Sequence, residues 1–315
     1  MNIQWYPGHM TKTRRQIEVD LKQVDAVCEI VDARIPASSR NPDIDAICGK
    51  KPRIVILNRM DLADPAATKR WAAYFREKGM AAVATDCKSK RGIGDFEPAV
   101  RSVLKEKLER DAARSMKRAL RVMIVGIPNV GKSTLINQIS GRKGAKAENR
   151  PGVTRGKQWV TVNNSLLLLD TPGILWPKFE DQQVGLKLAF TGAINDDILD
   201  PENMAIAFID HMVARDPDCI RKRYQIEFDS IEEPHEILAK IAIARGFKKK
   251  GDEPDLERTG KIMMDEYRGG KLGKITLELP EDIDVMLEKK AARDAEKALL
   301  DKERKRAYNK KKNGK

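Results

Sequence analysis

The chain has 315 residues, and 60 Lys or Arg against 47 Asp or Glu give it a net charge of +13 and a pI near 9.5. This balance indicates a polyanionic partner, while an aromatic content of 5% argues against base stacking as its main contact. The four cysteines lack C-x-x-C spacing and no histidines cluster, so neither a zinc site nor a disulfide framework is indicated. No apolar run or leader segment suits a membrane. We therefore expect a soluble cytoplasmic protein, and a monomer.

The first part of the chain alternates between helical and strand patterns. We predict a basic amphipathic helix over 11–23, strands over 26–31, 53–57 and 80–84, and helices over 65–78 and 94–109. This alternation predicts a parallel sheet. Asp32-Ala33-Arg34-Ile35-Pro36 follows the first strand, at the edge of the sheet where ligand sites gather. Arg34 could contact a nucleotide or RNA, or be an ordinary solvated loop residue.

Two further loops follow strands at the same edge. Asn58-Arg59-Met60-Asp61 comes after strand 53–57, and taken alone it is as consistent with an ordinary turn as with a binding element. Residues 85–89 come after strand 80–84 and include Asp86 and Cys87. The charged stretch 110–120 that comes later has no strand pattern.

A glycine-rich loop at 126–133 is the most informative motif. Gly-Ile-Pro-Asn-Val-Gly-Lys-Ser fits the phosphate-loop pattern G-x-x-x-x-G-K-[ST] and follows the apolar strand 122–125, with a helix expected next. Its N–H groups would surround phosphate oxygens, Lys132 would reach the β and γ phosphates, and Ser133 would ligate Mg²⁺. A chance glycine-rich turn is the alternative, and the preceding strand disfavours it. The predicted binding residues are Asn129, Val130, Gly131, Lys132, Ser133 and Thr134.

The next strands, 157–162 and 166–169, should form a hairpin through Asn163-Asn164. Asp170-Thr171-Pro172-Gly173 then resembles the D-x-x-G switch of GTPases. Asp170 would hold a Mg²⁺-bound water, the Gly173 N–H would face the γ-phosphate, and Thr154 would close on Mg²⁺ when that phosphate is present.

Beside a phosphate loop, residues 58–61 resemble the N-K-x-D element that reads guanine. The Asp61 carboxylate can accept hydrogen bonds from N1–H and the 2-amino group of guanine, whereas adenine offers neither donor. Asn58 and Arg59 would support the base. Asp86 and Cys87 occupy the position of the GTPase element whose main-chain groups contact the base.

This element precedes the phosphate loop, whereas ordinary GTPases place it afterwards. The sequence thus predicts an α/β fold: a circularly permuted P-loop GTPase domain, with a mostly parallel sheet flanked by helices. A smaller all-α C-terminal domain should follow it.

Residues 180–268 have helical apolar spacing and no catalytic constellation, so His211 and His235 are interpreted as surface or capping residues. The tail 288–315 holds 12 Lys or Arg and 5 Asp or Glu, a net charge of +7. Such a tail is either a solvated helix or an RNA contact, and the basic remainder of the chain favours RNA.

Together with Pro7-Gly8-His9-Met10 and the 32–36 loop, these motifs resemble the ribosome-biogenesis GTPase A (YlqF) family over about residues 1–280. The resemblance implies a bacterial enzyme that hydrolyses GTP to GDP slowly alone and faster on a precursor of the large ribosomal subunit. It also implies a helical domain that binds ribosomal RNA. The expected parts are a GTP-binding domain at 1–178, an RNA-binding domain at 179–280 and a basic tail at 281–315.

Two residue roles come from related GTPases. The first is catalysis by His9, because position 174 is isoleucine and cannot orient water. His9 would join Lys132, Thr154 and Gly173 in the catalytic set, although a lone histidine is otherwise structural. The second is a K⁺ ion held by Asn129, whose alternative role is turn geometry. Two alternative functions remain: a regulatory GTPase that acts through protein effectors, and an RNA-binding scaffold with little turnover.

Overall fold

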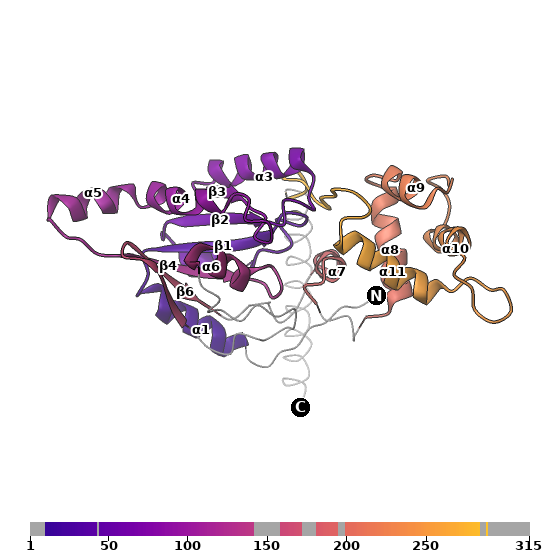
Figure 1. The fold of residues 1–315 in the computed structure, drawn as a ribbon, viewed down its shortest axis with the longest axis horizontal. Coiled ribbons are helices and arrows are strands. Elements are labelled where there is room, and N and C mark those ends of the chain that lie inside the picture. The colour runs from indigo at the N-terminus through magenta and orange to yellow at the C-terminus, as the bar shows by residue number, and fades with distance from the viewer. Residues whose placement is uncertain are drawn as a thin grey trace, which may run out of the picture.

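The computed structural model describes residues 10–42, 44–141, 158–171, 181–194, 199–283 and 288. Figure 1 shows a sheet flanked by helices in one half of the molecule and a group of helices in the other. Within the described part of the chain, no helix is long and apolar enough to cross a bilayer.

The sheet has six strands in the order β3-β2-β1-β4-β6-β5. Their bounds are Ala26–Asp32 for β1, Arg53–Asn58 for β2, Ala81–Ala84 for β3, Leu120–Gly126 for β4, Gln158–Asn163 for β5 and Leu166–Asp170 for β6. Every pairing is parallel except the β5–β6 hairpin, which is antiparallel. All seven residues of β1 are buried, including Glu29 and Asp32, as expected for a strand covered on both faces of the sheet. The predicted mostly parallel sheet is confirmed.

The strand order accounts for the unusual order of the motifs. β1 pairs with β2 on one side and with β4 on the other, although 87 residues separate β1 from β4 in the chain. Because β2 and β4 run in the same direction, the loops after Asn58 and Gly126 emerge at the same edge of the sheet. A permuted chain thus brings the two loops together in space.

Helices cover both faces of the sheet. On one face lie α1 (Met10–Leu21), α2 (Ile44–Cys48) and α3 (Pro65–Glu77), and on the other α4 (Phe96–Val103) and α6 (Lys132–Ser140). The single helix predicted over 94–109 is wrong. A 3-10 turn at Ile93–Asp95 leads into α4, which ends before Leu104. The next helix, α5 (Lys105–Ala113), extends into the charged stretch 110–120, for which the sequence predicts no strand.

The second group consists of α7 (Gln182–Phe190), α8 (Pro201–Val213), α9 (Asp218–Tyr224), α10 (Pro234–Ala244) and α11 (Leu256–Arg268). Asp200 caps α8 by accepting from the N–H groups of Glu202 and Asn203. α11 crosses α8 closely at Gly260, where a Cβ atom would lie 2.3 Å from the Pro201 carbonyl oxygen. The predicted all-α character of this part is confirmed.

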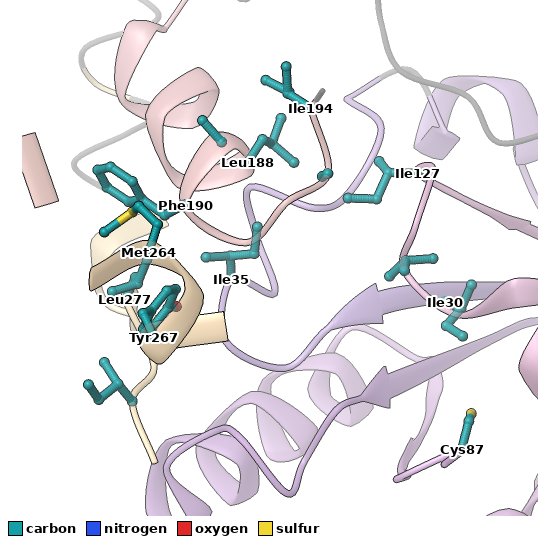
Figure 2. Close-up of a cluster of buried hydrophobic side chains, with 14 of the residues drawn as sticks. Ile30, Ile35, Cys87, Ile127, Leu188, Phe190, Ile194, Met264, Tyr267 and Leu277 are labelled. Atoms are coloured by element: carbon teal, nitrogen blue, oxygen red, sulfur yellow. The ribbon is translucent and has the colours of Figure 1, made fainter. Parts of the chain in front are cut away.

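One apolar core runs from the sheet into these helices. Figure 2 shows Leu188, Phe190, Met264, Tyr267 and Leu277 grouped at the end of α7, with Ile35 between this group and the sheet. The two halves of the molecule therefore share buried apolar surface.

The chain after α11 returns to the sheet half. The N–H groups of Ile275 and Leu277 donate to the carbonyls of Leu62 and Arg34. The Glu278 carboxylate is buried, accepts from the Ser38 N–H and hydroxyl, and pairs with Lys187 at 3.1 Å. The predicted division at 178/179 falls outside the described residues, and the three-part division of the chain stays a prediction.

Candidate nucleotide-binding site

The phosphate loop joins β4 to α6 in a conformation that demands glycine. Gly131 has φ +105°, and a Cβ atom there would lie 2.4 Å from the Asn58 side-chain nitrogen. At Gly126, a Cβ atom would lie 2.6 Å from the Ile30 carbonyl oxygen. Both glycines of the motif thus allow neighbouring strands and loops to approach closely, and α6 begins at Lys132, directly after the loop.

Lys132 is buried against its own loop. Its ammonium group donates to the carbonyls of Gly126 at 3.1 Å and Ile127 at 3.0 Å. Burial lowers the pKa of Lys132 to about 8, and the negative charge of Asp170 offsets only part of that effect. Phosphate oxygens beside this group would favour its charged form.

Asp170 ends β6 beside the phosphate loop. The register pairs it with Ile124 of β4, and the following Thr171 hydroxyl donates to the Ile124 carbonyl at 2.7 Å. Burial raises the pKa of the Asp170 carboxyl, and the charge of Lys132 counters this only in part. Asp170 Oδ1 is buried and has no hydrogen-bond partner among the described residues. A buried, unsatisfied carboxylate oxygen fits a Mg²⁺ ion or its water shell.

Asn58 connects the base-reading loop to its neighbours. It is 3% exposed, and its side-chain nitrogen donates to the Val130 carbonyl of the phosphate loop at 2.7 Å. Its side-chain oxygen accepts from the Cys87 N–H at 3.2 Å and the Thr85 hydroxyl at 3.3 Å. The three predicted loops, 58–61, 85–89 and 126–133, therefore meet around one side chain.

Arg59 and Asp61 lie on either side of Met60 in that loop. Arg59 has φ +61°, and its guanidinium donates to the Asn129 carbonyl at 3.0 Å. It also lies 3.8 Å from the Asp32 carboxylate. Asp61 is half-buried, and no described residue donates a hydrogen bond to its carboxylate. This leaves Asp61 available to a purine edge.

Asp86 and Cys87 have different local roles. The Asp86 carboxylate accepts from the N–H groups of Lys88 and Ser89 in a tight turn. Although burial alone would raise it, the hydrogen bonds from Ser89 and Lys88 lower the pKa of Asp86. Burial raises the pKa of Cys87 to about 11, which makes its thiol unreactive at neutral pH. Any contact with a base from this loop would come from the main chain.

Asn129 is directed away from its own loop. It has φ +59°, and its side-chain nitrogen donates to the Gly192 carbonyl, just after α7, at 3.1 Å. The helical half thus contacts the phosphate loop directly.

The suggestion that Arg34 serves a ligand or lies in solvent is wrong. Arg34 is 0% exposed and pairs with Asp32 through two hydrogen bonds of 3.0 and 2.7 Å. It also donates to the Thr191 carbonyl and lies over the Tyr267 ring, 5.3 Å from its centroid. Although burial alone would lower it, the Asp32 carboxylate raises the pKa of Arg34 above its usual range. Arg34 holds the sheet against the helical half.

The interpretation of His211 as a surface or capping residue is also wrong. Its Nε2 lies 3.0 Å from the Leu277 carbonyl oxygen, in the returning segment, and burial lowers the pKa of its imidazole. His235 is exposed at the start of α10, as expected. The predicted residues His9, Thr154 and Gly173, and nearly all of the tail, lie outside the described residues.

Comparison with known proteins agrees with this geometry. The sequence model of a family described as "50S ribosome-binding GTPase" matches residues 121–237, which begin at β4 and include the phosphate loop. Ribosome biogenesis GTPase A of Bacillus cereus is 47% identical over 289 residues, which cover 91% of this chain and 97% of that protein. The chain belongs to the ribosome biogenesis GTPase A family.

Other members of this family are similar along nearly their whole length. Ribosome biogenesis GTPase A of Thermotoga maritima is 34% identical over 89% of this chain and 96% of its own. A GDP-bound YlqF structure superposes with a TM-score of 0.59 at 31% identity, over 85% of this chain and all of that one. The GNP-bound YlqF from T. maritima gives 0.57, over 86% of this chain and 99% of that chain. The family assignment supports the permuted GTPase fold and an enzyme that hydrolyses GTP.

Proposed function

We propose that this GTPase acts in assembly of the large ribosomal subunit in the cytoplasm, where GTP binding controls its contact with the precursor particle and its ribosomal RNA. Hydrolysis to GDP would release the particle, and the particle would accelerate that hydrolysis. The observation that carries the proposal is the meeting of the base-reading and phosphate loops around Asn58, directly beside a helical half that touches Asn129. Nucleotide state can thus reach the part expected to bind RNA.

Guanine selection would come from Asp61. Its half-buried carboxylate lies in the same loop as Asn58 and Arg59, both of which are held to the phosphate loop. The Asp61 carboxylate, held in a loop that is bonded to the phosphate loop, can accept from N1–H and the 2-amino group of guanine. Adenine has neither donor and would leave the carboxylate unpaired.

Mg²⁺, which GTPases generally use, would be held by Ser133 and by Asp170, partly through water, and by Thr154 in the GTP state. When bound it would neutralise charge between the β and γ phosphates. Lys132 would contribute a second positive charge at the same oxygens, because the phosphates would replace its two main-chain acceptors.

His9 is the proposed catalytic histidine, acting on the attacking water when the protein is bound to the particle. His9→Ala should leave GTP affinity nearly unchanged and lower the particle-stimulated kcat, while the slow unassisted rate, about 10⁻⁴ to 10⁻² s⁻¹, stays the same. Stimulated turnover at the full rate in His9→Ala would assign catalysis to the particle instead.

The deciding experiment is sedimentation of ribosomal precursors with purified protein. We expect co-sedimentation with large-subunit particles in the presence of a non-hydrolysable GTP analogue, and release with GDP or an ATP analogue. A regulatory GTPase that acts through protein effectors would sediment with no particle in any state. An RNA-binding scaffold would sediment equally in all states.

A further inference from the structure

The C-terminal end of α7 is a point where three distant parts of the chain meet. A helix leaves its last carbonyl groups without partners inside the helix. Here Arg268 of α11 donates to the carbonyls of Ala189 at 2.7 Å and Phe190 at 3.0 Å. Side chains from the sheet half cover the next two carbonyls: Arg34 reaches Thr191 at 3.3 Å, and Asn129 reaches Gly192 at 3.1 Å.

The end of α7 is fixed to the helical half. Phe190 packs edge to face on Phe208, with ring centroids 5.3 Å apart, and Phe208 packs on Tyr267 at 4.8 Å. Figure 2 shows Phe190 and Tyr267 within the same apolar group. Gly192 has φ +77°, a conformation that favours glycine, and Arg268 lies against it. Arg268 of α11 thus holds the two residues that precede Thr191 and Gly192, and it lies beside Gly192 itself.

Asn129, in contrast, belongs to the phosphate loop and is held from two sides. Its side chain is held by Gly192, and its carbonyl accepts from Arg59 of the base-reading loop. It also has φ +59° at a residue that is not glycine. Asparagine tolerates this conformation better than most residues, and the two contacts fix the direction of its side chain and of its carbonyl.

We propose that Arg268 is a positioning residue for the phosphate loop, acting through the Gly192 carbonyl on Asn129. By fixing the end of α7, Arg268 pre-orders the loop for the nucleotide. The converse follows by linkage: a nucleotide that engages Asn129 changes the contact that the loop makes with the helical half. The inference rests on the proposed role of Asn129 in the nucleotide site.

A double-mutant cycle on the full-length protein tests the proposal. We expect Arg268→Ala to weaken binding of a fluorescent non-hydrolysable GTP analogue about 3- to 10-fold, since a less ordered loop must be ordered on binding. Asn129→Ala should weaken it to a similar degree. The double variant should be no weaker than Asn129→Ala alone, because Arg268 acts only through that side chain.

Arg215→Ala is the matched control. Arg215 is likewise an arginine of the helical half, but it makes an ion pair of 3.1 Å with Asp282 of the returning segment, and among the described residues no hydrogen bond joins it to the end of α7. Its loss should leave analogue binding unchanged. Denaturant unfolding shows whether each variant is folded. If Arg268→Ala does not fold, Arg268→Lys, which has a single donor group, replaces it in the same cycle.

Three results would overturn the proposal: unchanged binding in Arg268→Ala, unchanged binding in Asn129→Ala, or additive losses in the double variant. None of these measurements involves a ribosomal component. Failure to bind precursor particles would therefore contradict the proposed function but not the positioning role of Arg268. Additive losses in the double variant would contradict the positioning role of Arg268 but not the proposed function.

Discussion

Asn58 and Val130 are 72 positions apart in the chain, and the Asn58 side-chain nitrogen donates to the Val130 carbonyl oxygen at 2.7 Å. This hydrogen bond joins the loop expected to read the base to the loop expected to hold the phosphates. In a permuted chain no short connection does so, and the distance between the two halves of the nucleotide site depends on this hydrogen bond together with that from Arg59 to the Asn129 carbonyl.

We expect Asn58→Ala to weaken GTP and GDP binding together and to lower the free energy of unfolding by about 1–3 kcal/mol. The change leaves the buried Val130 carbonyl and Cys87 N–H without partners, and an unsatisfied buried group costs about that much. Nucleotide titration and urea unfolding measure the two effects. Asn164→Ala, in the exposed turn between β5 and β6, should change neither. Full affinity in Asn58→Ala would contradict the structural link.

Nucleotide affinity should fall as pH rises above about 8. Lys132 has a pKa of about 8 in the free protein, against an ordinary value of 10.5. Phosphate oxygens favour the ammonium form and raise that pKa, so above pH 8 the complex holds a proton that the free protein lacks. Binding must then take up a proton. Calorimetric titration at pH 8.5 in two buffers of different ionisation enthalpy detects this uptake, which should be absent in Lys132→Met.

Asp61→Asn should weaken GTP binding and improve xanthosine triphosphate binding. An amide can donate to the 2-oxo group of xanthine, whereas it cannot accept both guanine donors. The expected loss for GTP is at least about 10-fold, since each unpaired buried donor costs about 1–3 kcal/mol. Competition titration with GTP, xanthosine triphosphate and ATP measures the preference. Equal binding of ATP and GTP to the parent protein would refute the assignment of residues 58–61.

Hydrolysis should be faster in KCl than in NaCl at equal ionic strength. Asn129 lies in the phosphate loop, and its side-chain oxygen can serve as a K⁺ ligand while its nitrogen donates to Gly192. The difference between the salts should vanish in Asn129→Ala. Equal rates of phosphate release by the parent protein in both salts would refute the K⁺ role and assign Asn129 to turn geometry alone.

Deletion of residues 288–315 removes a net charge of +7. Each phosphate that the protein neutralises releases counterions, so the deletion should reduce the magnitude of the slope of log affinity for ribosomal RNA against log salt concentration by about 1 or more. Some RNA binding should remain. GTP affinity should be unaffected. An unchanged salt slope would show that the tail does not contact RNA.

The sequence by itself determined the parallel sheet, the phosphate loop and the motif order. The motifs expected to bind phosphate and guanine consist of particular residue types at short, fixed spacings, such as Gly131-Lys132-Ser133 and Asn58 with Asp61, so they can be recognised in the sequence alone. β-Strand bounds followed because a buried parallel strand is a short apolar run between turns.

Only the tertiary structure decided how the halves are joined. Arg34, Arg268 and Asn129 all bind main-chain carbonyls at the end of α7, and every residue has a carbonyl, so the partners leave no residue-type signal. Arg34 occurs in a loop where arginine is usually exposed, and its contacts with the Thr191 carbonyl and the Tyr267 ring, both distant in sequence, place it in the interior. Long-range contacts of this kind depend on where the chain returns in space, which local sequence patterns do not encode.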